Sequence, residues 1–159
     1  LLADEVAQDE PGQQLVLDRL LDLALISTLR AWFARCDADA PGWYRAHHDA
    51  VVGPAIRAIH EDPSRKWTVA TLAAEAGASR AAFARQFTAL VGEPPMTYVT
   101  RWRLDLAADL LRDSDETVES IAGRVGYANG FALTVAFKRE RGLTARQHRR
   151  ADGAIAYSA

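Results

Sequence analysis

The chain has 159 residues, of which 49% are apolar, with a net charge of −2 and a single cysteine. This length suits one good-sized domain or a smaller domain with an appendage, and it allows a packed core. No stretch approaches the roughly 18 consecutive apolar residues of a membrane-spanning helix, and no basic-then-apolar leader is seen, so we expect neither membrane insertion nor export. Cys36 alone cannot form an intramolecular disulfide, which fits a reducing cytosol. Because the chain opens at Leu1, we expect a longer parent protein.

The modest net charge is an average over two regions of opposite sign. Residues 1–63 hold five arginines and eleven acidic residues, a net charge of −6, whereas residues 64–150 hold fourteen basic and nine acidic residues, a net charge of +5. A basic region is compatible with contact to nucleic-acid phosphates. An ordinary solvated surface explains this balance equally well.

The first predicted element is a helix over residues 13–35, which follows an acidic connecting segment. No glycine or proline interrupts it, and apolar side chains surround most of its girth. Such a helix needs cover on most sides, so we expect an association surface and favour a homodimer through residues 13–35. In the alternative, Trp32 and Phe33 pack near Trp43 and Tyr44 of the same chain. The pattern over residues 54–60 predicts a second, short helix.

An internal repeat follows, with an offset of 49 residues. Residues 68–77 (TVATLAAEAG) align with residues 117–126 (TVESIAGRVG). One extra residue then enters the second copy, so that Phe83, Phe87 and Gly92 align with Leu133, Phe137 and Gly142. The repeat predicts two copies of one supersecondary unit.

Each copy predicts a helix, a tight turn and a second helix. The hydroxyl oxygen of Thr68 or Thr117 can cap the first helix, which has apolar residues at i, i+3, i+4 and i+7. That helix ends at Gly77 or Gly126, since a left-handed backbone costs least without a Cβ.

The second helix of each copy begins behind another capping residue, Ser79 or Asn129. This arrangement is the helix-turn-helix, whose second helix enters the major groove of DNA. One such pattern is weak evidence for a helix-turn-helix, but two patterns at matched spacing are specific evidence. Residues 95–111 predict a connecting helix of about 25 Å, long enough to hold two recognition helices about one DNA turn apart.

These motifs resemble the AraC/XylS family of transcription regulators over residues 52–150. The first copy runs TVATLAAEAGASRAAFARQFTALVGEPPMTYVTRWRLDLAADLL and the second TVESIAGRVGYANGFALTVAFKRERGLTARQHRR. The family pattern is matched in the first copy by Phe83, Arg85, Phe87, Gly92, Pro95, Tyr98, Arg103, Leu104, Ala107, Leu110 and Leu111. The chain departs from the pattern at Val135, Ala145 and His148, where the family usually has Arg, Pro and Tyr.

The resemblance implies an all-α fold with two helix-turn-helix subdomains, a long connecting helix and a preceding apolar helix. It divides the chain into residues 1–51, a remnant of a sensor or dimerisation domain, residues 52–150, the DNA-binding domain, and residues 151–159, a tail. The implied function is sequence-specific DNA binding in transcription regulation. Effector sensing is expected in a cupin-like domain outside this chain, apart from a helical tail over residues 1–45.

The base contacts are expected mainly from the first recognition helix, because an arginine can bridge guanine O6 and N7. The second helix offers few polar groups there, so Phe131 or Val135 is expected to touch thymine methyls. The expected base contacts are Arg80, Ala81, Ala84, Arg85, Gly130, Phe131 and Thr134. The expected phosphate contacts are Thr68, Ser79, Thr88, Arg103, Asn129, Lys138 and Arg139.

Several of these residues have a structural interpretation as well. Arg103 can pair with Asp105 or Asp109, or lie on a phosphate, and the two are equally favoured. The terminal cluster Arg146, Arg149 and Arg150 favours diffuse attraction to the DNA backbone. The aromatic and aliphatic residues expected in packing are Phe83, Phe87, Leu133, Phe137, Trp67, Trp102 and Tyr127.

No pattern typical of a catalytic site, phosphate loop or cofactor site is found, so we expect no enzyme activity, cofactor or metal. Joint metal ligation by His47, His48 and His60 is disfavoured, and Cys36 is expected to be a spare thiol. The expected partners are double-stranded DNA, a second copy of the chain and RNA polymerase, in the cytoplasm. The rival interpretations are a protein-interaction or dimerisation module with little DNA affinity, and an enzyme fused to such motifs.

Overall fold

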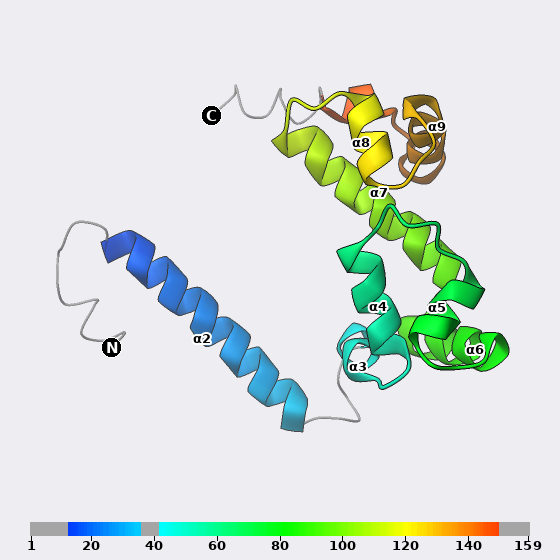
Figure 1. Cartoon of the computed structure of the whole chain (residues 1–159). Helices are drawn as coiled ribbons and strands as arrows, with labels where there is room; N and C mark the ends of the chain where they lie inside the picture. The colour runs from blue at the N-terminus through cyan, green and yellow to red at the C-terminus, as the bar shows by residue number, and fades with distance from the viewer. Residues whose placement is uncertain (1–12, 36–41, 150–159) are drawn as a thin grey trace. The chain divides into compact units, whose positions relative to one another are not determined.

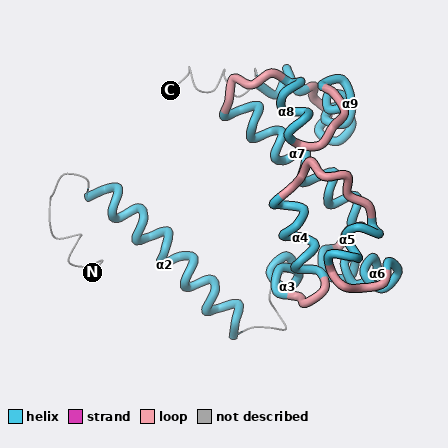
Figure 2. Tube along the Cα trace, in the orientation of Figure 1, coloured by secondary structure: helices cyan, strands magenta, loops and turns pink. Residues whose placement is uncertain are grey.

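The computed structural model describes residues 13–35 and 42–149, and this part of the chain consists of helices, turns and loops with no strand (Figures 1 and 2). The expected all-α class is confirmed. The chain divides into two compact units, Leu1–Arg45 and Ala46–Ala159. The helices are α2 (Gln13–Arg35), α3 (Gly42–His48), α4 (Val52–Glu61), α5 (Val69–Glu75), α6 (Arg80–Val91), α7 (Pro95–Asp113), α8 (Val118–Arg124) and α9 (Gly130–Arg141).

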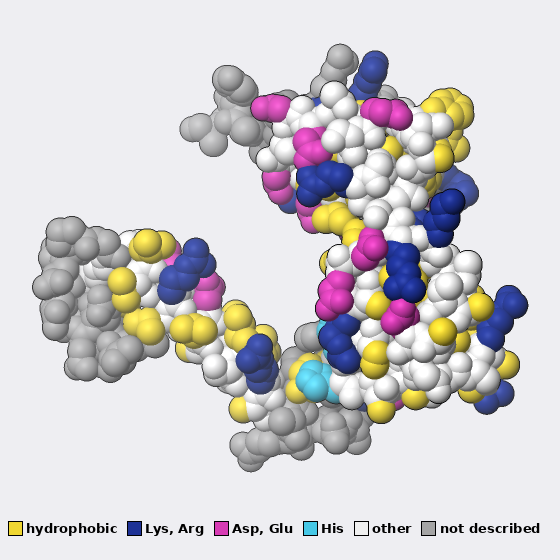
Figure 3. Space-filling model, viewed as in Figure 1, with side chains coloured by type: hydrophobic (Ala, Val, Ile, Leu, Met, Phe, Trp, Pro, Cys, Tyr) yellow, Lys and Arg dark blue, Asp and Glu magenta, His cyan; other side chains and the backbone are white. Residues whose placement is uncertain are grey.

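Helix α2 occupies the residues predicted for the first helix. Leu15, Leu23 and Leu25 are each more than 60% exposed, and Figure 3 shows apolar side chains along the helix. The side chains of Phe33 and Trp43 are not among those that the structure describes, so the alternative packing stays a prediction. Among the described helices, none combines the length and the apolar character needed to cross a membrane.

The predicted caps form in both copies of the repeat. The oxygen of each capping side chain accepts a hydrogen bond from a backbone N–H three residues later: Thr68 from Thr71 at 3.1 Å, Ser79 from Ala82 at 3.3 Å, Thr117 from Ser120 at 3.1 Å and Asn129 from Ala132 at 2.8 Å. The turns pass through Gly77 and Gly126, whose φ angles are +62° and +81°. Only glycine adopts this region without strain. Both helix-turn-helix motifs are therefore confirmed at the predicted residues.

Two separate hydrophobic clusters form the core of the second unit. The first joins α4, α5, α6 and the beginning of α7, and it contains Phe83 and Phe87. The second joins the rest of α7, α8 and α9, and it contains Leu133 and Phe137. All four side chains are fully buried, as predicted. Figure 1 shows α5 and α6 at one end of α7, and α8 and α9 at the other.

Two predicted helix boundaries shift by two residues because of local hydrogen bonds. Helix α4 begins at Val52 rather than residue 54, since the Asp49 carboxylate accepts the N–H groups of Val51 and Val52 at 2.9 and 2.8 Å. Helix α7 continues to Asp113 rather than residue 111, and Ser114 ends it by donating its hydroxyl to the carbonyl of Leu110 at 2.7 Å.

Candidate nucleic-acid interface

The outer face of α6 carries the polar groups predicted to meet DNA bases. Because Phe83 and Phe87 are buried on one side of the helix, Ala81 and Arg85 point away from the core. Arg80 and Arg85 are exposed, and among the described residues neither has a hydrogen-bond or ion-pair partner. Figure 3 shows basic side chains projecting over α6. These guanidinium groups are therefore available to an external acceptor.

The outer face of α9 has a different chemistry at the matching positions. Phe131 is 79% exposed and Val135 is 51% exposed, in the places that Ala81 and Arg85 occupy on α6. Lys138 lies on the same face and, within the described part of the chain, engages no acceptor. Apolar side chains gather over α9 in Figure 3. The face combines apolar contact area with one available cation.

Gly130 is not placed favourably for the base contact predicted for it. It is buried, and its N–H donates to Oε2 of Glu119 at 2.7 Å. A Cβ at this position would lie 2.9 Å from the same oxygen. Sequence reasoning missed Glu119, although the repeat gave a signal, since Glu119 aligns with Ala70 and has no acidic counterpart in the first copy.

Arg103 is half-buried, and its guanidinium donates to backbone carbonyls rather than to Asp105 or Asp109. Its Nε donates to the carbonyl of Pro63 and its Nη2 to that of Arg65, both at 2.7 Å, and its Nη1 lies 3.5 Å from the carbonyl of Gly126. Because these carbonyls take up Nε and Nη2, the geometry does not favour the predicted phosphate contact of Arg103.

The carboxylates predicted for Arg103 have other partners. Asp105 pairs with Arg141, and Asp109 pairs with Arg112 at 2.9 Å. The local ion pair predicted for Arg103 is therefore wrong.

Two threonines on the recognition helices donate to their own backbone. Thr88 donates its hydroxyl to the carbonyl of Ala84 at 2.9 Å, and Thr134 donates to that of Gly130 at 2.8 Å. Each oxygen can still accept from a base amino group. Phosphate oxygens, however, need a donor, so the geometry does not favour the phosphate contact predicted for Thr88.

Two of the other predicted phosphate contacts at helix starts, Ser79 and Asn129, keep a donor. Ser79 and Asn129 use a side-chain oxygen for capping, which leaves the Ser79 hydroxyl hydrogen and the Asn129 Nδ2 group to donate outward. Thr68 is exposed at the start of α5, where it forms a capping box with Thr71. Phosphate contacts by Thr68, Ser79 and Asn129 stay predictions.

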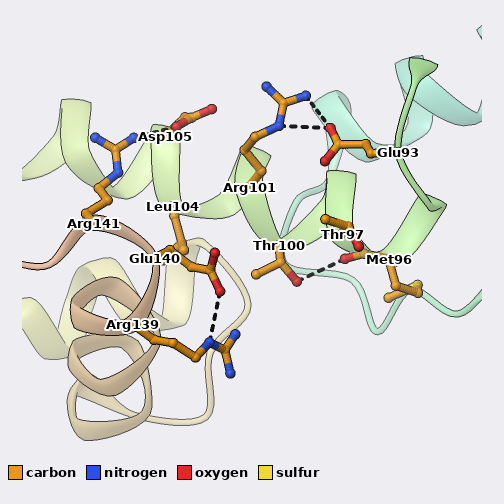
Figure 4. A pocket seen from close by; sticks show the side chains of 10 residues that line it. All are labelled: Glu93, Met96, Thr97, Thr100, Arg101, Leu104, Asp105, Arg139, Glu140 and Arg141. Atoms are coloured by element: carbon orange, nitrogen blue, oxygen red, sulfur yellow. Dashed lines mark hydrogen bonds and ion pairs between the residues drawn. The ribbon is translucent and has the colours of Figure 1, made fainter.

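A groove of about 580 Å³ lies between α7 and the end of α9, and local ion pairs occupy its charged side chains (Figure 4). Arg101 Nε donates to Glu93 Oε1 at 2.9 Å, and Arg139 Nε donates to Glu140 Oε1 at 2.9 Å. Arg139 is exposed and its pair is a surface one, which is worth little. Its phosphate contact stays a prediction.

The terminal basic cluster is only partly available to DNA. Arg149 Nε donates to the carbonyl of Leu111 at 3.1 Å, and its Nη2 donates to that of Glu116. Arg149 therefore connects the short helical segment over residues 145–149 to the end of α7, which corrects the predicted diffuse role. Arg146 is exposed, and Arg150 lies outside the described residues.

The histidines and tryptophans of the first cluster have packing roles. The ring of His60 stacks on Trp102 with centroids 3.8 Å apart, and its Nε2 lies 2.8 Å from the Tyr98 hydroxyl. Trp67 is buried and donates its Nε1 to the carbonyl of Asp62 at 2.8 Å. Within residues 13–35 and 42–149, no group of three or more candidate metal ligands occurs. Cys36 lies outside the described residues.

Two helix-turn-helix motifs carried on one connecting helix define a double helix-turn-helix protein. A family model described as a helix-turn-helix domain matches residues 72–151, half of the chain, and a cupin model matches residues 1–34. The chain belongs to the AraC-type helix-turn-helix family.

Its relatives include an AraC-like transcription regulator from Streptomyces lividans, 42% identical over 92% of this chain and 48% of the relative. The HTH-type transcriptional regulator AlkR from Acinetobacter baylyi is 35% identical over 87% of this chain and 45% of its own length. The chain thus spans about half the length of these relatives.

Solved structures share the fold of the second unit. The DNA-binding domain of AdpA, a global transcriptional factor in complex with a target DNA, matches with a TM-score of 0.62 and 32% identity, covering 66% of this chain and 95% of that one. A regulator with an AraC-type DNA-binding domain from Chromobacterium violaceum matches with a TM-score of 0.58 and 21% identity, over 62% of this chain and 88% of that one. The second match supports the fold alone.

Proposed function

We propose that this chain is the sequence-specific DNA-binding part of a transcription regulator. The observation that carries the proposal is the outer face of α6. Arg80 and Arg85 are exposed there, whereas Phe83 and Phe87 are buried on the inner face. The relatives named as transcription regulators and the AdpA domain, which is in complex with a target DNA, support it. No catalytic role is proposed.

In this proposal the two recognition helices make different kinds of contact with DNA. Helix α6 reads base edges through Arg80 and Arg85, since arginine makes two hydrogen bonds to guanine in the major groove. Helix α9 offers Phe131 and Val135 to thymine methyl groups and Lys138 to a phosphate. Contacts to phosphate position the protein, whereas contacts to bases specify the sequence. Most of the sequence information is therefore assigned to the half-site under α6.

Selection of bound DNA from a random pool, followed by salt titration of the selected site, tests this function. A regulator enriches a defined sequence, and its affinity falls with salt at a slope of about −0.9 per neutralised phosphate on the log scale. A chain that enriches no sequence would contradict the proposal. Because Phe131 and Val135 also form an exposed apolar patch, the competing function is a protein-interaction module. Such a module would show no DNA binding in the salt titration.

The first unit is proposed to belong to an effector-sensing domain and to mediate a homodimer. The cupin match over residues 1–34 supports the first role, and the exposed apolar side chains of α2 support the second. Monomers rarely expose a contiguous apolar patch beyond a few hundred Å². Cytoplasmic action and contact with RNA polymerase remain parts of the proposal.

Sedimentation of this chain at micromolar concentration tests the homodimer. We expect a mass of about twice the 17.4 kDa monomer, and a monomer after Leu21→Asp with Leu25→Asp, both on exposed positions of α2. Arg30→Asp is the matched control, since it changes the charge of α2 without removing apolar surface. A wild-type chain that sediments as a monomer would rule the homodimer out.

A further inference from the structure

The two helix-turn-helix motifs have separate apolar cores, and Arg103 lies at the boundary between them. Along α7, Val99 is the last fully buried residue of the first cluster and Leu104 is the first of the second. The strongest helix packing is within each motif and along α7. The two apolar clusters are therefore connected through α7, and neither cluster by itself packs one motif against the other.

Arg103 bridges this boundary with hydrogen bonds to both motifs. Its Nε and Nη2 donate to the carbonyls of Pro63 and Arg65, in the loop between α4 and α5 that leads into the first motif. Its Nη1 reaches the carbonyl of Gly126, in the turn of the second motif. A planar guanidinium holds several acceptors in a fixed geometry, which a lysine cannot reproduce.

The acceptors are themselves held in place. The Asp62 carboxylate accepts the N–H groups of Ser64 and Arg65 at 3.1 and 3.0 Å, which fixes the loop that presents its carbonyls to Arg103. Burial lowers the pKa of Arg103, although an arginine keeps its charge. The half-buried cation therefore depends on these carbonyls for its solvation.

The turn at Gly126 also packs directly on the first motif. A Cβ on this residue would lie 2.9 Å from the Cα and carbonyl oxygen of Ser64 and 2.9 Å from Nη2 of Arg103. The glycine thus permits a close approach between the two motifs as well as the left-handed turn. Arg103, Gly126 and Ser64 form one junction, and it joins segments far apart in the sequence.

We propose that Arg103 is a positioning residue that fixes the orientation of α6 relative to α9 and so sets the half-site spacing that the protein accepts. This inference rests on the proposed DNA-binding function. Each base pair rotates the second half-site by about 34°, because a DNA turn holds about 10.5 base pairs. A rigid junction therefore accepts one spacing, and a loosened junction accepts several.

The test compares binding to the selected site with variants of that site in which the two half-sites are one or two base pairs closer or farther apart. For the wild-type chain, we expect a change of one base pair to weaken binding by about tenfold or more, at least as much as a mismatched base pair. For Arg103→Ala, we expect weaker binding to the best site and a flat profile, with neighbouring spacings within about threefold. Arg103→Lys keeps the charge but not the planar fork, so its profile should be intermediate. This variant also serves if the alanine variant does not fold.

Arg112→Ala is the matched control on α7, because within residues 13–35 and 42–149 Arg112 pairs only with Asp109 and Asp113 of its own helix, and the spacing profile of this variant should stay sharp. The salt slope on a single half-site separates positioning from phosphate contact, since loss of a phosphate contact reduces the slope by about one unit. An Arg103→Ala chain with an unchanged sharp profile, or with a reduced slope and uniform weakening, would overturn the inference alone. A wild-type chain that enriches no sequence would refute the proposed function, and this inference with it.

Discussion

Gln86 on α6 donates its side-chain amide to both carboxylate oxygens of Asp49, at 2.9 and 3.0 Å, across 37 residues of sequence. Asp49 also caps α4 through the N–H groups of Val51 and Val52. One carboxylate thus connects the start of α4 with the recognition helix, at the residue next to Arg85. This contact helps to orient the side of α6 that we propose to face DNA.

Removal of the Asp49 carboxylate should destabilise the second unit. Asp49→Ala is expected to lower the free energy of unfolding by about 1–2 kcal/mol, because α4 loses its cap and Gln86 loses its acceptor. Urea denaturation measures this change. Asp115→Ala is the control, since Asp115 is exposed and has no partner among the described residues. Equal stabilities of the Asp49 and Asp115 variants would contradict the capping role.

The contribution of Asp49 should also depend on pH. Burial by itself raises the pKa of Asp49, but the hydrogen bonds from Val52, Val51 and Gln86 outweigh it and leave the pKa below its usual value. The stabilisation is therefore present above the unfolded pKa of about 3.9 and is lost as pH falls through the folded pKa. The difference between the wild type and Asp49→Ala should shrink in acid below about pH 4.

Arg85→Ala should weaken specific DNA binding by about 1–3 kcal/mol and relax the preference at one base position. The reason is the exposed position of Arg85 on the outer face of α6. Repeating the selection with the variant measures the change, and Arg112→Ala serves as a control for the loss of one arginine. A selected sequence identical to that of the wild type, base for base, would show that Arg85 reads no base.

The two half-sites should differ in sequence information. The half bound by α6 should be the better defined, since α9 presents Phe131 and Val135 where α6 presents Ala81 and Arg85. Val135→Arg should add a preferred base, typically guanine, to the poorer half. The selected sites of the two proteins provide the measurement. Equal information in both halves for the wild type would contradict the assigned division of work.

The stability of the first cluster should fall in mild acid because of His60. Burial lowers the pKa of His60, and the nearby His47 lowers it further. A histidine with a lowered folded pKa stabilises the protein fully above its unfolded pKa of about 6.5, and this stability is lost as pH falls towards the folded value. We expect the melting temperature to fall between pH 7 and pH 5.

The variant His60→Phe tests this assignment. It keeps an aromatic ring against Trp102 but cannot be protonated, so the decline in melting temperature should be weaker despite the lost contact with the Tyr98 hydroxyl. His48→Gln, which removes an exposed histidine, is the comparison. If both variants decline as steeply as the wild type, His60 is not the group responsible.

Much of the fold follows from interactions between residues close together in the sequence. The caps at Thr68, Ser79, Thr117 and Asn129 join groups three residues apart, and the turns at Gly77 and Gly126 need only a positive φ. The apolar period of 3.6 residues also places Phe83 and Phe87 on the inner face of α6. For this reason the sequence by itself predicted both motifs, their helix starts and the outward position of Arg85.

The errors at Arg103 and Gly130 concern contacts between residues that are distant in the sequence. Arg103 meets Pro63 and Gly126 at separations of 40 and 23 residues, and Glu119 reaches Gly130 across a turn. The sequence shows that a residue is an arginine or a glutamate. It does not show whether the charged group of that residue faces solvent or a partner within the protein. Only the packing of α7 against both motifs determines which partner lies within hydrogen-bond distance. The tertiary structure therefore decided that Arg103 joins the motifs and that Gly130 is buried.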